Sequence, residues 1–134
     1  MITVDGQIFV SYRDGSDFGV LATDPDTKAD WTYQGLDLRS PVKKPIKITD
    51  WTTAEVYCQP LVDGTSIQFW YKVDKDGDFV RATMQDGFPS FQAPGEKKAV
   101  FLLATAGDIF EPQVVGIHSG NNSPVVNRIK VYFN

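Results

Sequence analysis

Three aspartates on alternate positions in the stretch VDKDGDF, namely Asp74, Asp76 and Asp78, have a spacing that suits metal binding. Calcium prefers several oxygen ligands, and many calcium loops begin with alternating aspartates. An EF-hand loop that starts at Asp74 needs glycine at its sixth position and an acid at its twelfth, but this chain has Phe79 and Gln85 there. Asp-Gly pairs also form tight hairpin turns. We therefore predict a turn and no cofactor, with calcium at the three aspartates as the alternative.

Catalytic chemistry has few residues to use in this chain. His118 is the only histidine, so a Ser-His-Asp triad or a histidine metal site would have to include it. Its place beside a Gly-Asn turn is typical of a structural or exposed histidine. The G-x-S-x-G motif of serine nucleophiles does not occur. Cys58, the only cysteine, alternates with Ala54 and Val56, which predicts a small core residue. We predict that the protein is not an enzyme.

The aromatic residues offer a different chemistry, the binding of a sugar ring or of a protein partner. Trp70 lies on the polar side of the predicted strand SIQFWYKV, and an outward-facing tryptophan can stack on a sugar or fill a partner's pocket. Trp31 and Trp51 lie near loops and would extend such a surface. The alternative is that Trp70 packs beneath a folded-over loop such as FPSFQAPGE.

Length and charge limit the classes of partner. The 134 residues suffice for one domain, 1–134, and the net charge of −4 disfavours wrapping a phosphate backbone. Apolar runs such as AVFLLA are far too short to cross a bilayer, and the start MITVDGQ lacks the features of a signal peptide. We therefore expect no nucleic acid partner, no membrane insertion and no signal peptide.

The elements that must position these residues are β-strands. Apolar and polar residues alternate between turn residues along the whole chain, whereas helical periodicity is nearly absent. Many short strands with Gly- and Pro-rich connections predict an all-β fold: an antiparallel two-sheet β-sandwich, jelly-roll-like or immunoglobulin-like. The expected strands are 7–12, 18–23, 46–51, 54–61, 66–73, 79–84, 99–105, 111–119 and 128–134.

Two further patterns refine this expectation. The turn RDGSD predicts an N-terminal β-hairpin over residues 1–23, which we expect to pack on the sandwich because an isolated hairpin is marginally stable. The run AVFLLA does not alternate, so we expect both of its sides to be covered. In the last strand, alternation predicts that Ile129, Val131 and Phe133 face inward.

Several segments of the chain occur in an order that can be compared with that of known protein families. They are GQIFVSYRDGSDFGVLATD, the aromatic-bearing loop ADWTYQGLDLRSPVKK, PLVDGTSIQFWYKVDKDGDF, the stretch G....F..PGEKKAVFLL and the terminal SPVVNRIKVYFN. Together they cover nearly the whole chain and resemble β-sandwich domains in the virion proteins of tailed bacteriophages, those of tails, baseplates and fibres. The resemblance implies a structural or attachment role with no catalytic residues. It also implies synthesis in the host cytoplasm, localisation to the virion, and contacts with other virion proteins and with further copies in a trimer or hexamer.

Two functions remain open from the sequence. The first is a non-enzymatic virion component that acts through protein–protein contacts. The second is a carbohydrate-binding module that stacks a host-surface glycan on Trp70, with help from Trp51 or Trp31, because the same architecture serves both functions. A phage attachment protein that binds a host glycan would combine the two.

Overall fold

The computed structural model describes residues 2–4, 7–22, 28–39 and 49–134, and the regular elements in these residues are all β-strands. This confirms the predicted all-β fold. The strands are β1 (Ile2–Val4), β2 (Gln7–Asp14), β3 (Asp17–Ala22), β4 (Trp31–Gln34), β5 (Leu38–Arg39), β6 (Asp50–Cys58), β7 (Ser66–Val73), β8 (Val80–Arg81), β9 (Thr83–Met84), β10 (Lys98–Ala106), β11 (Ile109–Ile117) and β12 (Val126–Phe133).

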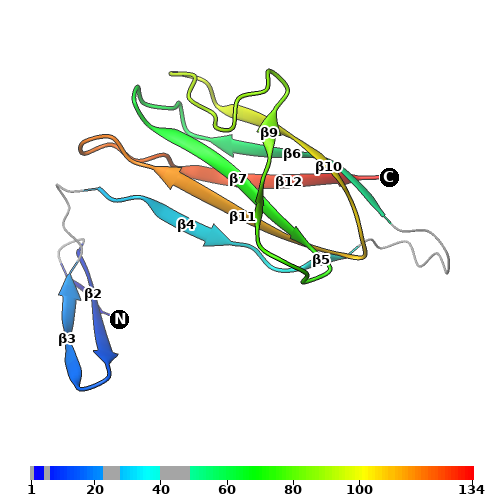
Figure 1. The fold of residues 1–134 in the computed structure, drawn as a ribbon. Helices are drawn as coiled ribbons and strands as arrows, with labels where there is room; N and C mark the ends of the chain where they lie inside the picture. The colour runs from blue at the N-terminus through cyan, green and yellow to red at the C-terminus, as the bar shows by residue number, and fades with distance from the viewer. Residues whose placement is uncertain (1, 5–6, 23–27, 40–48) are drawn as a thin grey trace.

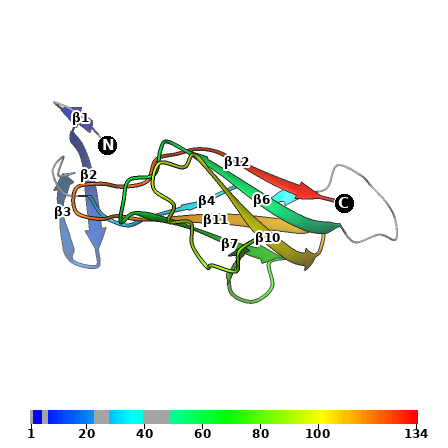
Figure 2. The ribbon, with the colours of Figure 1, turned by 90° about the horizontal axis from the view of Figure 1, so that it is seen from above.

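Two antiparallel sheets pack against each other to form the main body of the molecule (Figure 1). The four-stranded sheet has the order β12-β6-β10-β9, and the five-stranded sheet has the order β4-β11-β7-β8, with β5 also paired to β11. The view from above shows that the long axes of the strands in the two sheets are nearly aligned (Figure 2). The predicted antiparallel β-sandwich is therefore confirmed.

Strands β4 and β12 are the outermost strands of their sheets at one side of the sandwich. Among the described strands, β4 pairs with β11 alone and β12 pairs with β6 alone, which leaves the other edge of each strand open. Because residues of β4 and β12 line a common groove, the two strands lie at the same open side.

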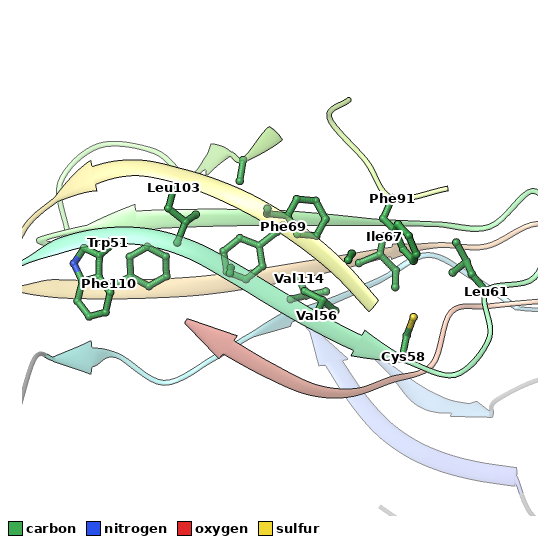
Figure 3. Close-up of a cluster of buried hydrophobic side chains, with 14 residues drawn as sticks. Trp51, Val56, Cys58, Leu61, Ile67, Phe69, Phe91, Leu103, Phe110 and Val114 are labelled. Atoms are coloured by element: carbon green, nitrogen blue, oxygen red, sulfur yellow. The ribbon is translucent and has the colours of Figure 1, made fainter. Parts of the chain in front are cut away.

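The core between the sheets is built largely from aromatic rings (Figure 3). Phe69 stacks on Phe101 at 5.8 Å between ring centroids and on Phe110 at 6.4 Å, and Phe110 contacts Trp51 at 4.9 Å. All four side chains are at most 2% exposed. Burying one large apolar side chain stabilises a fold by about 1.5–3 kcal/mol, so this cluster is a major source of stability.

Strand β6 replaces the two strands that were expected at 46–51 and 54–61, although residues 46–48 lie outside the described part. The buried residues of β6 change phase between Trp51 and Ala54. The register of the neighbouring strand β10 shifts between Leu102 and Thr105, opposite this point. A β-bulge adds a residue without ending the strand, which is why the break in alternation did not end β6.

The segment expected as one strand at 79–84 is divided between the two sheets. Its first part, β8, pairs with β7, and its second part, β9, pairs with β10. Ala82 lies between them, 3% exposed, and donates its backbone N–H to the Phe69 carbonyl at 2.9 Å. The chain therefore crosses from one sheet to the other at a single buried residue.

The expectation that AVFLLA is covered on both sides is wrong. Ala99, Phe101 and Leu103 are buried, but Leu102 is 43% exposed on the outer face of the four-stranded sheet. In β12, Ile129 and Val131 pack against the core as expected. The register shifts after Tyr132, and Phe133 lies at the margin of the core, with its ring edge against Trp51.

The N-terminal hairpin is confirmed, and it belongs to a separate three-stranded sheet with the order β1-β2-β3. Its turn contains Gly15 at φ 60°, a conformation that glycine adopts without steric cost. Figure 1 shows β2 and β3 beyond one end of the sandwich. Packing of residues 1–23 on the sandwich stays a prediction, since its range includes residues outside the described part. The described residues contain no helix with the length and hydropathy needed to span a membrane.

Candidate functional site

Trp70 points away from the core on the outer face of the five-stranded sheet, as the strand pattern predicted. Its indole N–H donates to the Gln68 side-chain carbonyl at 3.0 Å, and the guanidinium of Arg81 lies 5.5 Å from the ring centroid. Arg81 pairs with Trp70 in the register of β7 and β8. The indole is therefore half-buried between neighbours of its own sheet and leaves part of its surface accessible.

Trp51 does not belong to an accessible aromatic surface, and the expectation that it helps to bind a glycan is corrected here. The residue is 2% exposed and packs among the core rings. Its indole N–H donates to the Gly107 carbonyl at 3.0 Å. The change of phase in β6 turns this side chain inward, so it cannot reach a sugar.

Trp31 opens β4 and lies on the inner side of the open edge of the sandwich. Its indole covers Gly116 on β11, where a Cβ atom would come within 2.2–2.5 Å of the ring. The indole N–H donates to Ser123 Oγ at 3.1 Å and to the Pro124 carbonyl at 3.2 Å. Only glycine leaves room for the ring at this position, and these contacts fix its orientation.

A groove of about 440 Å³ runs along this open edge, between β4 and β12. It falls in the usual size range of small-molecule sites, which is roughly 300–1,000 Å³. Tyr33, two residues after Trp31, lines it and is 53% exposed. The lining residues are Trp31, Tyr33, Val114, Pro124, Val125, Val126, Asn127 and Arg128. Two aromatic residues, several apolar residues, one asparagine and one arginine therefore border a common space.

Arg128 joins the groove to the outer face of the four-stranded sheet. The register between β12 and β6 shifts between Val126, which packs against the core, and Arg128, which pairs with Tyr57. This bulge places the extra residue, Asn127, in the groove lining. The Arg128 guanidinium lies 4.3 Å from the centroid of the Tyr57 ring.

Three cations surround the Tyr57 ring. Besides Arg128, the ammonium groups of Lys98 and Lys130 each lie 5.5 Å from the ring centroid. The negative face of an aromatic ring attracts cations at such distances. The carboxylate of Glu55 accepts a hydrogen bond from the Tyr57 hydroxyl at 2.6 Å. We refer to Glu55, Tyr57, Lys98, Arg128 and Lys130 as the basic patch.

Hydrogen bonds within the basic patch shift the pKa values of Glu55 and Lys98. The hydrogen bonds that Glu55 accepts from Tyr57 and from Lys98 lower the pKa of its carboxyl group to about 2, and Tyr132 adds a third. In return, the hydrogen bond to Glu55 raises the pKa of Lys98. Glu55 is therefore ionised at neutral pH and is already bonded to three neighbours.

The aspartates of VDKDGDF form a turn, and one of them has a clear structural role. Asp74 Oδ1 accepts the backbone N–H groups of Asp108 at 2.8 Å and Ile109 at 2.9 Å, so it joins this turn to the β10–β11 connection. Asp76 and Asp78 are exposed and line a shallow hollow with Asp74. In the part of the chain that the structure describes, no three His, Cys, Asp or Glu side chains gather as metal ligands would.

His118 and Cys58 occupy structural positions. Asp30 Oδ1 accepts the backbone N–H of His118 at 2.9 Å and lies 2.6 Å from its ring Nδ1. These hydrogen bonds with His118 lower the pKa of the Asp30 carboxyl group. Cys58 lies in the core, and burial raises the pKa of its thiol, which disfavours the nucleophilic thiolate. In these contacts, neither His118 nor Cys58 forms a hydrogen-bonded pair of a nucleophile and a base.

Sequence reasoning missed Tyr33 and Arg128 as residues of a site. It treated ADWTYQGLDLRSPVKK as a loop, whereas residues 31–34 form the edge strand β4. The alternation of Trp31 and Tyr33 with polar Thr32 and Gln34 was the available signal. The alternation that turns Ile129 inward turns its neighbour Arg128 outward, but the place of Arg128 at the rim of a groove depends on the bulge at Asn127.

Comparisons with known proteins give no relative. No protein-family model matches the chain, and neither the curated proteins nor the solved structures contain a match. The function must therefore be argued from the residues and the geometry of this chain.

Proposed function

We propose that this chain is a non-enzymatic component of a bacteriophage virion, in its tail, that acts as a structural, assembly or attachment protein through protein–protein contacts. The observation that carries the proposal is the exposed apolar surface of the N-terminal sheet. Phe18 and Val20 of β3 are 79% and 66% exposed, and they share one face because they are two positions apart. Small sheets that expose such residues gain stability from a partner.

The architecture is the kind of β-sandwich to which the resemblance points. Strand β6 pairs with β10 in one sheet and β7 pairs with β11 in the other, and these two interlocked pairs favour an immunoglobulin-like topology over a jelly-roll-like one. The assignment to a virion rests on the resemblance of the sequence segments to phage virion domains. We propose other copies of the chain, in a trimer or hexamer, and neighbouring virion proteins as partners, after synthesis in the host cytoplasm.

Light scattering across a concentration series tests the proposal. We expect the mass of three or six copies, as the symmetry of phage tails requires. Replacing Phe18→Ser should shift the mass toward one chain, whereas Leu36→Ser should leave it unchanged, although Leu36 is 86% exposed. A chain that stays monomeric at every concentration and binds no protein of its virion would contradict the proposal.

A second candidate function is carbohydrate binding, and the groove between β4 and β12 favours it. Aromatic side chains with polar neighbours are the usual means of binding a sugar ring, and Trp31 and Tyr33 supply them in a preformed groove. Trp70 on the outer face of the other sheet is the alternative place for the glycan. Calcium at the turn of Asp74, Asp76 and Asp78 stays an additional proposal.

Calorimetric titration with glycans that bind the wild-type chain separates these places. Tyr33→Ala should lower the affinity if the glycan lies in the groove, and Trp70→Ala should lower it if the glycan lies on the outer face. Both side chains are partly exposed, so the fold should survive either change. If neither variant changes the affinity, both places are wrong.

A further inference from the structure

The basic patch is unusual in this acidic chain. It brings three cationic side chains, Lys98, Arg128 and Lys130, around one tyrosine ring, although the chain as a whole has a net charge of −4. Like charges repel each other, so gathering them lowers stability unless something compensates. Among the residues that the structure describes, Glu55 supplies the only carboxylate that is bonded within the patch. The patch therefore keeps an excess of positive charge.

Two of the three cations have no acidic partner among the described residues. Lys98 forms a salt bridge with Glu55 at 2.9 Å. For Arg128 and Lys130, the described part of the chain supplies no carboxylate within 4.0 Å. Their neighbour is the π face of Tyr57, which attracts a cation but leaves its N–H groups able to donate. A guanidinium so placed can donate to a carboxylate or a phosphate through two parallel hydrogen bonds.

The patch and the groove are one continuous surface because Arg128 belongs to both. Arg128 shares the groove lining with the aromatic residues Trp31 and Tyr33, and Lys130 lies two positions further along β12 on the same face of the strand. Asp30 directly precedes Trp31 of the groove, and its carboxylate is hydrogen-bonded to His118. A ligand that crosses this rim would therefore meet aromatic rings first and positive charge second.

We propose that the groove and the basic patch together bind an acidic saccharide. A sugar ring lies against Trp31 and Tyr33, and the carboxylate or phosphate that it carries accepts hydrogen bonds from Arg128, with Lys130 close by. The side-chain amide of Asn127, which can both donate and accept, meets the hydroxyl groups of the sugar. This inference rests on the proposed carbohydrate-binding function and adds the chemical class of the glycan.

The first experiment is a glycan array probed with the wild-type chain. The array carries neutral oligosaccharides, saccharides with sialic or uronic acids, and saccharides with phosphate groups. We expect binding to acidic saccharides only, and the two acidic groups show whether carboxylate or phosphate is preferred. Binding to neutral saccharides alone would overturn the inference while the carbohydrate-binding function survives. Binding to no saccharide would overturn both.

The second experiment is calorimetric titration with the best acidic saccharide from the array. Arg128→Gln should weaken binding by about 10- to 100-fold, because a hydrogen bond to a charged group is lost. Arg81→Gln is the matched control, since Arg81 also lies over an aromatic ring on an outer sheet face, 5.5 Å from the Trp70 centroid. Equal losses in the two variants, or no loss in Arg128→Gln, would overturn the inference.

A chemical control removes the charge from the ligand and leaves the protein unchanged. For a carboxylate ligand, the methyl ester of the same saccharide should bind as weakly to the wild-type chain as the acid binds to Arg128→Gln. For a phosphate ligand, the dephosphorylated saccharide serves the same purpose. A hexapeptide of glutamate should not compete with the acidic saccharide for binding. Full competition by the peptide would show that negative charge alone suffices for binding, which would overturn the inference.

Discussion

The two faces of the four-stranded sheet are built from the same strands but use their aromatic residues differently. On the inner face of β6 and β10, side chains such as Val56 and Phe101 are 0% exposed and contact the other sheet. On the outer face, the Tyr57 ring is half-buried among charged side chains. One face thus provides much of the stability of the fold, whereas the other carries the charged groups to which we assign ligand binding in our proposal. Changes on the inner face should therefore alter stability, and changes on the outer face should alter charge and binding.

The largest effect should come from the inner face. Phe101→Ala removes a ring that stacks on Phe69 and leaves a cavity between the sheets. The free energy of unfolding should fall by about 3–5 kcal/mol, measured by denaturant titration. Tyr57→Ala on the outer face is the comparison and should cost clearly less. Equal losses for Phe101 and Tyr57 would remove the contrast between the two faces.

A smaller effect is expected at the open edge, where the inner side of the sandwich meets the groove. Gly116→Ala places a methyl group within 2.2–2.5 Å of the Trp31 ring, so the indole must move. The free energy of unfolding should fall by about 1–3 kcal/mol, and the fluorescence of Trp31 should change. In a Trp31→Ala background the same substitution should cost much less. If the loss persists there, the clash is not with the indole.

The smallest effect is a pH dependence that belongs to the outer face. The pKa of Glu55 is lowered from 4.5 to about 2, so its bonds stabilise the fold above pH 4.5. That stability should be lost as the pH falls from 4.5 toward 2, because the carboxylate then takes up a proton. Glu55→Gln should reduce this pH dependence of stability in acid titrations, whereas the exposed Glu96→Gln should not. An unchanged acid transition in Glu55→Gln would contradict the assignment.

The sequence indicated the fold better than the site, and particular residues show why. Alternation in the last strand placed Ile129 and Val131 inside because a strand turns successive side chains to opposite faces. It failed where a bulge intervenes, so Trp51 was expected near the surface and lies in the core. The groove depends on β4 of one sheet and β12 of the other lying at the same side of the sandwich, and such a long-range arrangement has no local signal in the sequence.

The single-residue crossing at Ala82 has a consequence for motion. Because the chain is hydrogen-bonded to one sheet just before this residue and to the other just after it, the two sheets cannot slide apart there without breaking both sets of bonds. We therefore expect the side of the sandwich that carries β8 and β9 to open less readily than the side between β4 and β12. The buried backbone N–H of Ala82, which donates to the Phe69 carbonyl, should exchange hydrogen slowly, and any widening of the groove should occur at the other side, between β4 and β12.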